Sequence, residues 1–286
     1  MPAEAAAAGP IHGAFPSHAT PLSKRLWDGT SCIAWRCLYH PFVRALADAT
    51  LPPCRFRFYV AQDATFLAAF AAAYATARTA AAGDEDAVAV LTTLAAAVQE
   101  ELRLHSAYAT AWGVDPAALA APPAPATAAY CRFLDLAGDG YHGKAKVQAI
   151  LAAMAPCSRL YGFLGCALAE AGVVGASPAP HPFADWVETY SSQAYLAAPA
   201  AKEALLDRLA GEVEEGKRNG EMEGRVEGDE GAFFTQLLIS PALDAGTRIA
   251  AYPFPPGRCQ ARTLTHRFSI SGGAARPRPL PTTPGG

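Results

Sequence analysis

Apolar residues recur at steps of three and four positions over long stretches of this chain. The pattern is clearest over residues 147–170, where one stripe contains Val147, Ile150, Leu151, Met154, Leu160, Tyr161, Leu164 and Leu168. Residues at this spacing lie on one face of an α-helix. The stripe therefore predicts a long amphipathic helix over residues 147–170.

Pro156 interrupts this stripe and is followed by Cys157. Proline donates no N–H and its ring clashes with the carbonyl one turn back, so we expect the helix to kink or to restart there. In a restarted helix, free N–H groups and the positive helix end would favour a thiolate at Cys157. Tyr161, four residues on, would share its face and hydrogen-bond the sulfur. The alternative is that Cys157 is a small buried core residue, and these residues alone leave both interpretations open.

The same periodicity predicts helices along most of the chain. One pattern begins near Leu22 and continues through residues 40–51, where Pro52 and Pro53 end it. Further helices are predicted over about residues 55–79, over residues 86–112, from about residue 127, and over residues 181–196 and 200–213. No segment reads as part of a sheet. With about seven helices, the expected fold is an all-α, single-domain helical bundle.

The helix predicted over about residues 55–79 carries a carboxylate on its apolar face. Asp63 shares one stripe with Phe56, Tyr59, Phe70 and either Phe66 or Leu67. Burying a carboxylate without partners costs several kcal/mol, so Asp63 must be hydrogen-bonded. Its partner is either a neighbouring helix or a ligand, and the cost of burial alone does not choose between them.

A second polar feature lies on the helix predicted over residues 86–112. Glu101 and His105 stand four residues apart and therefore share one helix face. We interpret them as a surface or half-buried salt bridge in preference to a catalytic pair.

The two ends of the chain and one internal segment lack helical periodicity. Residues 1–21 have neither the arginines of a transit peptide nor the apolar core of a secretory signal, and are predicted to be disordered. Residues 211–231 contain six glycines, each costing about 1 kcal/mol relative to alanine inside a helix. We therefore expect a flexible stretch within a helical domain of residues 22–243, followed by a disordered tail over residues 244–286.

Composition narrows the ligand and the compartment. The net charge is −3 and no dense Lys/Arg block is present, so a small neutral or cationic ligand fits better than nucleic acid. The seven cysteines are odd in number and lack a CxxC pair with suitably spaced histidines, which argues against a disulfide framework and a zinc site. A reducing, cytoplasmic setting is the expectation, with organellar import left open. Lacking an uninterrupted apolar run of about 18 residues, the chain is not expected to span a membrane.

Seven stretches occur in the order and near the spacing of a known family. They are HPFVRALADATL, FRFYVAQDATFLAAF, the Glu101–His105 pair, AAYCRFL, MAPCSRLYGF, HPFADWVETY and EGAFF. On these motifs the chain resembles the TenA family of thiaminase-II-like proteins across about residues 24–240. The segments PCSRLYGFLG and VETYSS most resemble the TenA-type domain of plant thiamin monophosphate phosphatases. The resemblance implies a haem-oxygenase-like all-α fold and hydrolysis of aminopyrimidines or thiamin to hydroxymethylpyrimidine, without metal or haem.

The resemblance also implies roles for three of the residues described above. Cys157 matches the family nucleophile in its PC-x-x-x-Y motif, which marks the cysteine-type branch of the family. Tyr161 matches the tyrosine of that motif, which lies close to the sulfur. Asp63 matches the aspartate that binds the ring nitrogen and amino group of the pyrimidine.

Further site residues follow from the same resemblance. Tyr130 and Tyr190 match tyrosines that line the pocket, and Phe66 stands there where many relatives have a tyrosine. Glu230 and Phe233 match the E-x-x-F of the last helix, where the glutamate is the acid/base and the phenylalanine packs on the ring. The glycine-rich stretch before Glu230 replaces what should be an amphipathic helix.

The implied chemistry fits these residues. A Cys157 thiolate would add to the electron-poor pyrimidine held by Asp63, and Glu230 would transfer a proton as the amine or thiazolium leaves. Two alternatives stay open: a helical module that binds the pyrimidine without turnover, and a detached domain of a bifunctional phosphatase. No acidic DxD-type motif follows residue 243. Since relatives are commonly tetramers, the resemblance also favours a homo-oligomer.

Overall fold

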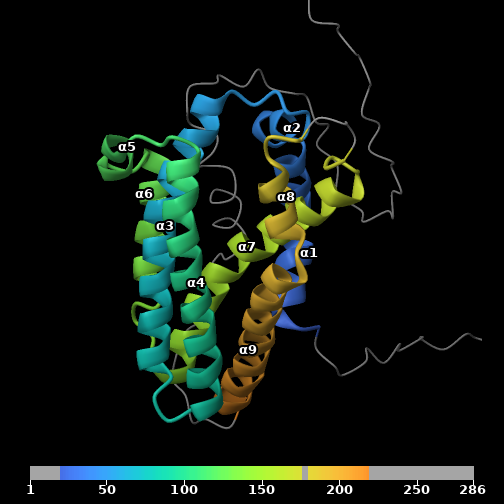
Figure 1. The fold of residues 1–286 in the computed structure, drawn as a ribbon. Coiled ribbons are helices and arrows are strands. Elements are labelled where there is room, and N and C mark those ends of the chain that lie inside the picture. The colour runs from blue at the N-terminus through green and yellow to red at the C-terminus, as the bar shows by residue number, and fades with distance from the viewer. Residues whose placement is uncertain (1–19, 176–179, 219–286) are drawn as a thin grey trace, which may run out of the picture.

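The computed structural model describes residues 20–175 and 180–218, and within these ranges the chain forms nine α-helices and no β-strand (Figure 1). The helices are α1 (Leu22–Leu38), α2 (Pro41–Ala47), α3 (Pro53–Ala80), α4 (Glu85–Ala111), α5 (Pro116–Ala120), α6 (Pro125–Leu136), α7 (Gly143–Glu170), α8 (Ala184–Ser191) and α9 (Gln193–Arg218). The all-α prediction is confirmed. The predictions for the two tails concern residues that lie outside the described ranges, apart from residues 20 and 21, and the helical domain begins at Leu22 as predicted.

The central element of the bundle is α7. The helices α1, α3, α8 and α9 pack against it, and α3 pairs along its length with α4 (Figure 1). By length and composition α7 could cross a membrane, yet most of its apolar stretch is buried inside the bundle. Its apolar stripe is therefore the surface on which the other helices assemble.

Two apolar clusters make up the core. The first cluster is formed by α1, α2, α8, the first part of α3 and the last parts of α4 and α7. The second cluster is formed by α6, α9, the rest of α3, most of α4 and the first part of α7. Three helices therefore cross from one cluster to the other, α3 at residues 61–66, α4 at residues 98–109 and α7 at residues 155–160.

Pro156 lies inside a continuous helix. The helix α7 runs from Gly143 to Glu170 with this proline in its interior, so of the two predicted outcomes the restart is wrong and the kink stays a prediction. Pro156 is itself buried, and the packing of four helices along α7 outweighs the loss of one backbone hydrogen bond. Cys157 consequently lies in the interior of α7 and not at the N-terminus of a restarted helix.

Several element boundaries differ from the sequence-based ones. The pattern predicted as one helix over residues 22–51 is divided at His40, whose Nδ1 accepts a hydrogen bond from Phe42 N at 3.1 Å and caps α2. The short helix α5 was not predicted. The predicted helix over residues 181–196 is broken at Ser192. Finally, α9 extends past Val213 to Arg218, so the first part of the glycine-rich segment is helical.

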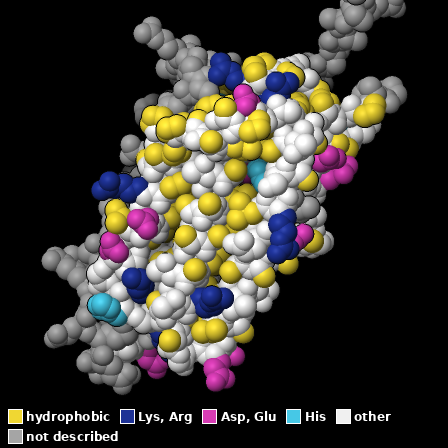
Figure 2. Space-filling model, turned by 60° about the vertical axis from the view of Figure 1, so that its left-hand side comes forward, with side chains coloured by type: hydrophobic (Ala, Val, Ile, Leu, Met, Phe, Trp, Pro, Cys, Tyr) yellow, Lys and Arg dark blue, Asp and Glu magenta, His cyan; other side chains and the backbone are white. Residues whose placement is uncertain are grey.

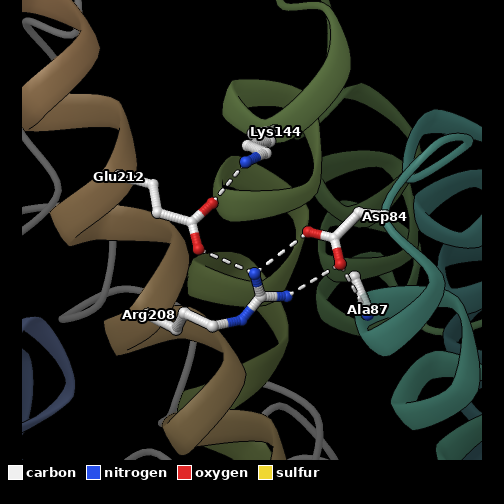
Figure 3. A network of polar contacts seen from close by, with 5 residues as sticks. All are labelled: Asp84, Ala87, Lys144, Arg208 and Glu212. Atoms are coloured by element: carbon white, nitrogen blue, oxygen red, sulfur yellow. Dashed lines mark hydrogen bonds and ion pairs between the residues drawn. The ribbon is translucent and has the colours of Figure 1, made fainter.

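A polar network ties together the ends of three helices (Figure 3). Asp84 caps α4 by accepting a hydrogen bond from Ala87 N at 2.9 Å. It also accepts hydrogen bonds from both terminal nitrogens of Arg208, at 3.0 and 3.2 Å. Arg208 donates to Glu212 at 2.7 Å, and Glu212 accepts from Lys144 at 2.5 Å. The network therefore fixes α9 to the start of α4 and to the start of α7.

Candidate active site

Ionisable residues gather where the two apolar clusters meet. Asp63 on α3, Glu101 and His105 on α4, and Cys157 on α7 all lie in the segments where these helices cross between clusters. Each of the four is largely but not fully enclosed. The crossing segments bring together three helices that are separate in sequence, so a polar site forms at the joint between apolar regions.

His105 pairs with Asp63. Its Nε2 lies 2.8 Å from Asp63 Oδ2, with the two side chains 12% and 10% exposed. Burial acts to lower the pKa of His105, but the charges of Asp63 and Glu101 raise it on balance, which favours the imidazolium. The predicted salt bridge between Glu101 and His105 is wrong, because no ion pair joins them among the described side chains. The helix face that carries Glu101 and His105 packs against α3, and His105 pairs there with Asp63 instead of with Glu101.

Glu101 is a buried carboxyl beside this pair. Burial and the neighbouring Asp63 carboxylate raise its pKa to about 7, while His105 and Lys202 act to lower it. A carboxyl that titrates near neutral pH can both accept and release protons under working conditions. Glu101 thus has the acid–base property of a proton-transfer group, which the sequence-based interpretation as a salt bridge missed.

Cys157 is a free thiol with part of its surface accessible. Burial, together with the charges of Asp63 and Glu101, raises the pKa of Cys157, while Lys202 lowers it. The helix-terminus effect proposed from the sequence does not operate, since α7 is continuous here. In the unliganded protein Cys157 is therefore a protonated thiol, and any thiolate must be stabilised by a side chain or by a bound ligand.

Aromatic rings flank the polar residues from both clusters. On the side of the second cluster, the ring centroids of Phe66 and Tyr130 lie 4.9 Å apart. On the side of the first cluster, those of Tyr161 and Tyr190 lie 4.8 Å apart. Burial and the nearby Cys157 raise the pKa of Tyr130, and burial together with Asp63 and other neighbours does so for Tyr190. The structure therefore gathers the described residues of the predicted site around one junction.

Contacts between α7 and α8 hold Tyr190 in place. A Cβ at Gly165 would lie 2.5 Å from the carbonyl carbon of Tyr190, so only glycine allows α8 to approach so closely. On the same helix, Trp186 donates its Nε1–H to the Tyr59 hydroxyl at 3.3 Å. The predicted hydrogen bond from Tyr161 to Cys157 stays a prediction. Glu230 and Phe233 lie outside the described residues.

Lys202 is a residue of this region that the sequence analysis missed. It comes from α9 and is only 1% exposed. A signal was available, because Lys202 precedes Leu205, Leu206 and Leu209 at the spacing of one apolar stripe. A lysine on such a stripe must bury its ammonium or extend it to the surface.

Comparison with known proteins gives the family. The sequence model of the TENA/THI-4/PQQC family matches residues 29–227. The chain belongs to this family. It is 33% identical over 209 residues to the Arabidopsis thaliana protein named "Bifunctional TH2 protein, mitochondrial", covering 68% of this chain and 33% of the relative. The chain thus spans about one third of the length of that relative.

Two further comparisons agree with this result, the first in sequence and the second in fold alone. The chain is 32% identical over 166 residues to the aminopyrimidine aminohydrolase of Halalkalibacterium halodurans, covering 56% of this chain and 70% of the relative. Its fold matches that of the TenA homologue from P. horikoshii OT3 with a TM-score of 0.61, at 21% identity and covering 78% and 98% of the two chains. The predicted haem-oxygenase-like helical bundle is confirmed by this likeness.

Proposed function

We propose that this protein is an aminopyrimidine or thiamin hydrolase of the thiaminase II kind, releasing 4-amino-5-hydroxymethyl-2-methylpyrimidine for thiamin salvage. The observation that carries the proposal is the meeting of Asp63 and Cys157 at one junction flanked by aromatic rings. The named activity of the Halalkalibacterium halodurans relative supports the substrate class. A flat, electron-poor heterocycle with an amino group suits such a site.

In the proposed mechanism Asp63 positions the ring. Its Oδ2 is paired with His105, so Oδ1 is the oxygen that accepts from the pyrimidine amino group. The ion pair with His105 orients the carboxylate before substrate arrives, which reduces reorganisation during binding. The rings of Phe66 and Tyr130 on one side, and of Tyr161 and Tyr190 on the other, enclose the heterocycle.

Cys157 then acts as the nucleophile. Its sulfur, once deprotonated, bonds to a ring carbon of the pyrimidine, and the C–N bond of the exocyclic carbon breaks as the amine leaves with a proton. Water next adds its oxygen to the exocyclic carbon and loses a proton, and the carbon–sulfur bond breaks to return the thiolate. One water is consumed, and one alcohol and one amine are formed.

The proton transfers need an acid/base. By resemblance we assign this role to Glu230, with Phe233 packing on the ring. Glu101 is the carboxyl with the required pKa among the described residues, and it is the next candidate. Glu230→Gln and Glu101→Gln separate the two assignments, because the residue that transfers the proton is the one whose loss lowers kcat and removes a limb of its pH profile.

The test of the nucleophile is release of hydroxymethylpyrimidine from the aminomethyl-pyrimidine and from thiamin. Cys157→Ala is expected to lower kcat at least 100-fold for the preferred substrate. Cys166→Ala is the matched control, because Cys166 is another partly buried free cysteine of α7. Equal rates for wild type and Cys157→Ala would contradict the proposed mechanism.

A second candidate function is a pyrimidine-binding module without turnover, or one domain of a bifunctional phosphatase. The match covers 33% of the Arabidopsis relative, and this observation favours the second of these functions, one domain of a bifunctional protein, as a candidate. Calorimetry that shows tight binding of hydroxymethylpyrimidine by a protein that hydrolyses neither substrate would support it over the hydrolase.

We also propose that the chain is a homo-oligomer, with a tetramer suggested by family resemblance. On α3 and α4 the exposed positions include Ala72, Ala75, Ala89 and Ala96, and Figure 2 shows a face of the molecule on which apolar side chains are widely exposed. Such surfaces of small side chains suit close helix packing between copies. Light scattering after size-exclusion chromatography is expected to give a mass above that of one chain, and a monomer at micromolar concentration would contradict this.

The proposed compartment is the cytoplasm. The Arabidopsis relative carries the name mitochondrial, so organellar import is the competing outcome. Imaging of the full chain fused to a fluorescent protein in its source cells distinguishes the two.

A further inference from the structure

Lys202 presents its ammonium to α7 inside the protein. Its Nζ donates to Ser158 Oγ at 2.6 Å and to the Met154 carbonyl at 3.4 Å, and it lies 4.6 Å above the ring of Phe70. No carboxylate among the described residues forms an ion pair with it. A fully buried ammonium without a carboxylate partner is costly, so its presence here needs an explanation other than stability.

The two atoms that hold Lys202 bracket Cys157 along the helix. Met154 is three residues before Cys157 and Ser158 is the next residue after it. Residues three apart in a helix lie on neighbouring turns of one face. The ammonium is therefore anchored along the same part of α7 from which the Cys157 side chain projects.

We propose that Lys202 is the counter-cation of the Cys157 thiolate, held beside α7 by Ser158 and Met154 so that negative charge can develop on the sulfur. This inference rests on the proposed function, in which Cys157 is the nucleophile. Lys202 acts through the sulfur and is thus a positioning residue: it is not required to touch the substrate.

The groups that face Cys157 leave this role to Lys202. From α3 and α4 come the carboxyl groups of Asp63 and Glu101, which oppose a thiolate, with His105 already paired to Asp63. The other titratable neighbours are the tyrosine hydroxyls of Tyr74, Tyr130, Tyr161 and Tyr195. Lys202 is the group whose charge lowers the pKa of Cys157.

Lys202 stays charged at neutral pH. Burial lowers its pKa to about 8, while Cys157, Glu203 and Glu101 act to raise it. Binding of an aminopyrimidine to Asp63 would partly neutralise the carboxylate that opposes the thiolate. The ammonium would then be the dominant charge near the sulfur, so the thiol would be activated mainly when substrate is present.

The same two helices supply a matched control. Arg159 and Glu203 directly follow Ser158 and Lys202 in sequence and form an ion pair of 2.5 Å between α7 and α9. The Arg159 guanidinium lies 4.7 Å over the ring of Trp27, on α1. Removing Arg159 therefore deletes a cation from the same helix pair without removing Lys202 or the two groups, Ser158 and Met154, that hold it.

The experiment measures how fast Cys157 reacts with iodoacetamide as a function of pH in the full chain. Iodoacetamide is uncharged, so a lost cation does not change its approach, and peptide mass spectrometry separates Cys157 from the other cysteines. Lys202→Gln keeps a donor for Ser158 but removes the charge, and Lys202→Arg keeps the charge. Arg159→Gln is the control.

Lys202→Gln is expected to slow alkylation of Cys157 about tenfold at pH 6–7, where Lys202 carries its charge, which corresponds to a change of about one unit in the thiol pKa, and to have little effect above the Lys202 pKa of about 8. Lys202→Arg is expected to restore most of this reactivity, and Arg159→Gln to leave the profile unchanged. In turnover, Lys202→Gln should lower kcat more than it raises KM. Circular dichroism identifies variants that fail to fold, and Lys202→Met is the second uncharged variant should Lys202→Gln be one of them.

A pH profile of alkylation that is unchanged in a folded, uncharged Lys202 variant overturns the proposal. So does an equal shift in Arg159→Gln, because the effect would then be general to the helix pair. The readout does not depend on hydrolysis. Failure of the nucleophile assignment, seen as full activity of Cys157→Ala, is therefore distinguishable from failure of the role of Lys202.

Discussion

The imidazole of His105 and the carboxylate of Asp63 form an ion pair of 2.8 Å that joins α4 to α3. The pair lies where both helices pass between the two apolar clusters, so it is shielded on either side by core side chains. It gives Asp63 a fixed orientation and a structural partner at once. The two interpretations of Asp63 that the sequence left open are therefore compatible: a neighbouring helix holds the carboxylate, and one oxygen remains for a ligand.

Breaking this pair is expected to destabilise the protein. Asp63→Asn and His105→Gln each leave a buried partner uncompensated, at a cost of about 3–5 kcal/mol for a fully buried pair. The double variant should lose less than the sum, with a coupling free energy above about 1 kcal/mol. Urea denaturation at pH 6 measures all three, and strict additivity would show that the pair is not coupled.

The same pair predicts a pH dependence of stability. His105 has a raised pKa in the folded state, so its contribution is fully present below its unfolded pKa, about 6.5. It is lost as the pH rises through the higher folded value. The free energy of unfolding of the wild type should therefore decline over this window relative to His105→Gln. Parallel curves for the two proteins would contradict the shift.

Glu101 is expected to limit stability at high pH. Its pKa is raised to about 7 in the folded state, so the carboxyl favours folding when protonated and opposes it once ionised. Glu101→Gln removes this cost and should raise the free energy of unfolding at pH 8 by about 2–3 kcal/mol, with little effect at pH 4. A variant that is destabilised at pH 8 would show instead that the ionised carboxylate makes favourable contacts.

Gly165 is expected to tolerate no side chain. In Gly165→Ala the new Cβ would meet the backbone of Tyr190, so α8 must move, at a cost of about 1–3 kcal/mol. Because Tyr190 shifts with α8, KM for the pyrimidine should rise. Gly211→Ala in α9 is the control: nothing lies within 4 Å of its Cβ, and the helix should gain about 0.5–1 kcal/mol. Thermal unfolding of both variants checks the contrast.

In the network of Figure 3, Asp84 both caps α4 and forms an ion pair, and substitutions of Asp84 can separate the two contributions to stability. Burial acts to raise the pKa of Asp84, but the Ala87 N–H and Arg208 lower it on balance. Its contribution is thus present above the unfolded pKa and lost as the pH falls through the folded value. Asp84→Asn keeps a cap and loses the ion pair, whereas Asp84→Ala also loses the cap, worth about 1 kcal/mol. Denaturation at pH 7 should rank wild type above Asn above Ala, and equal Asn and Ala variants would exclude the cap.

The apolar spacing of the chain determined the helices and the order of the motifs. The stripe over residues 147–170 predicted α7, and the ordered motifs predicted the family and the residues Asp63, Tyr130, Cys157, Tyr161 and Tyr190. These features follow from local periodicity and from residue identity, both of which can be read from the sequence without knowledge of the fold. Boundaries were less well determined, as at His40 and Ser192, because one apolar stripe can continue across a break in the backbone.

The tertiary structure decided which groups face one another. The spacing of Glu101 and His105 places them on one face of α4. Only the packing of α3 against that face determines that His105 forms its ion pair with Asp63. Likewise Pro156 stays within α7 because four helices pack along it, and Lys202 reaches Ser158 because α9 crosses there. A sequence pattern fixes the direction in which a side chain leaves its own helix, whereas its partner, burial and pKa depend on the helix opposite.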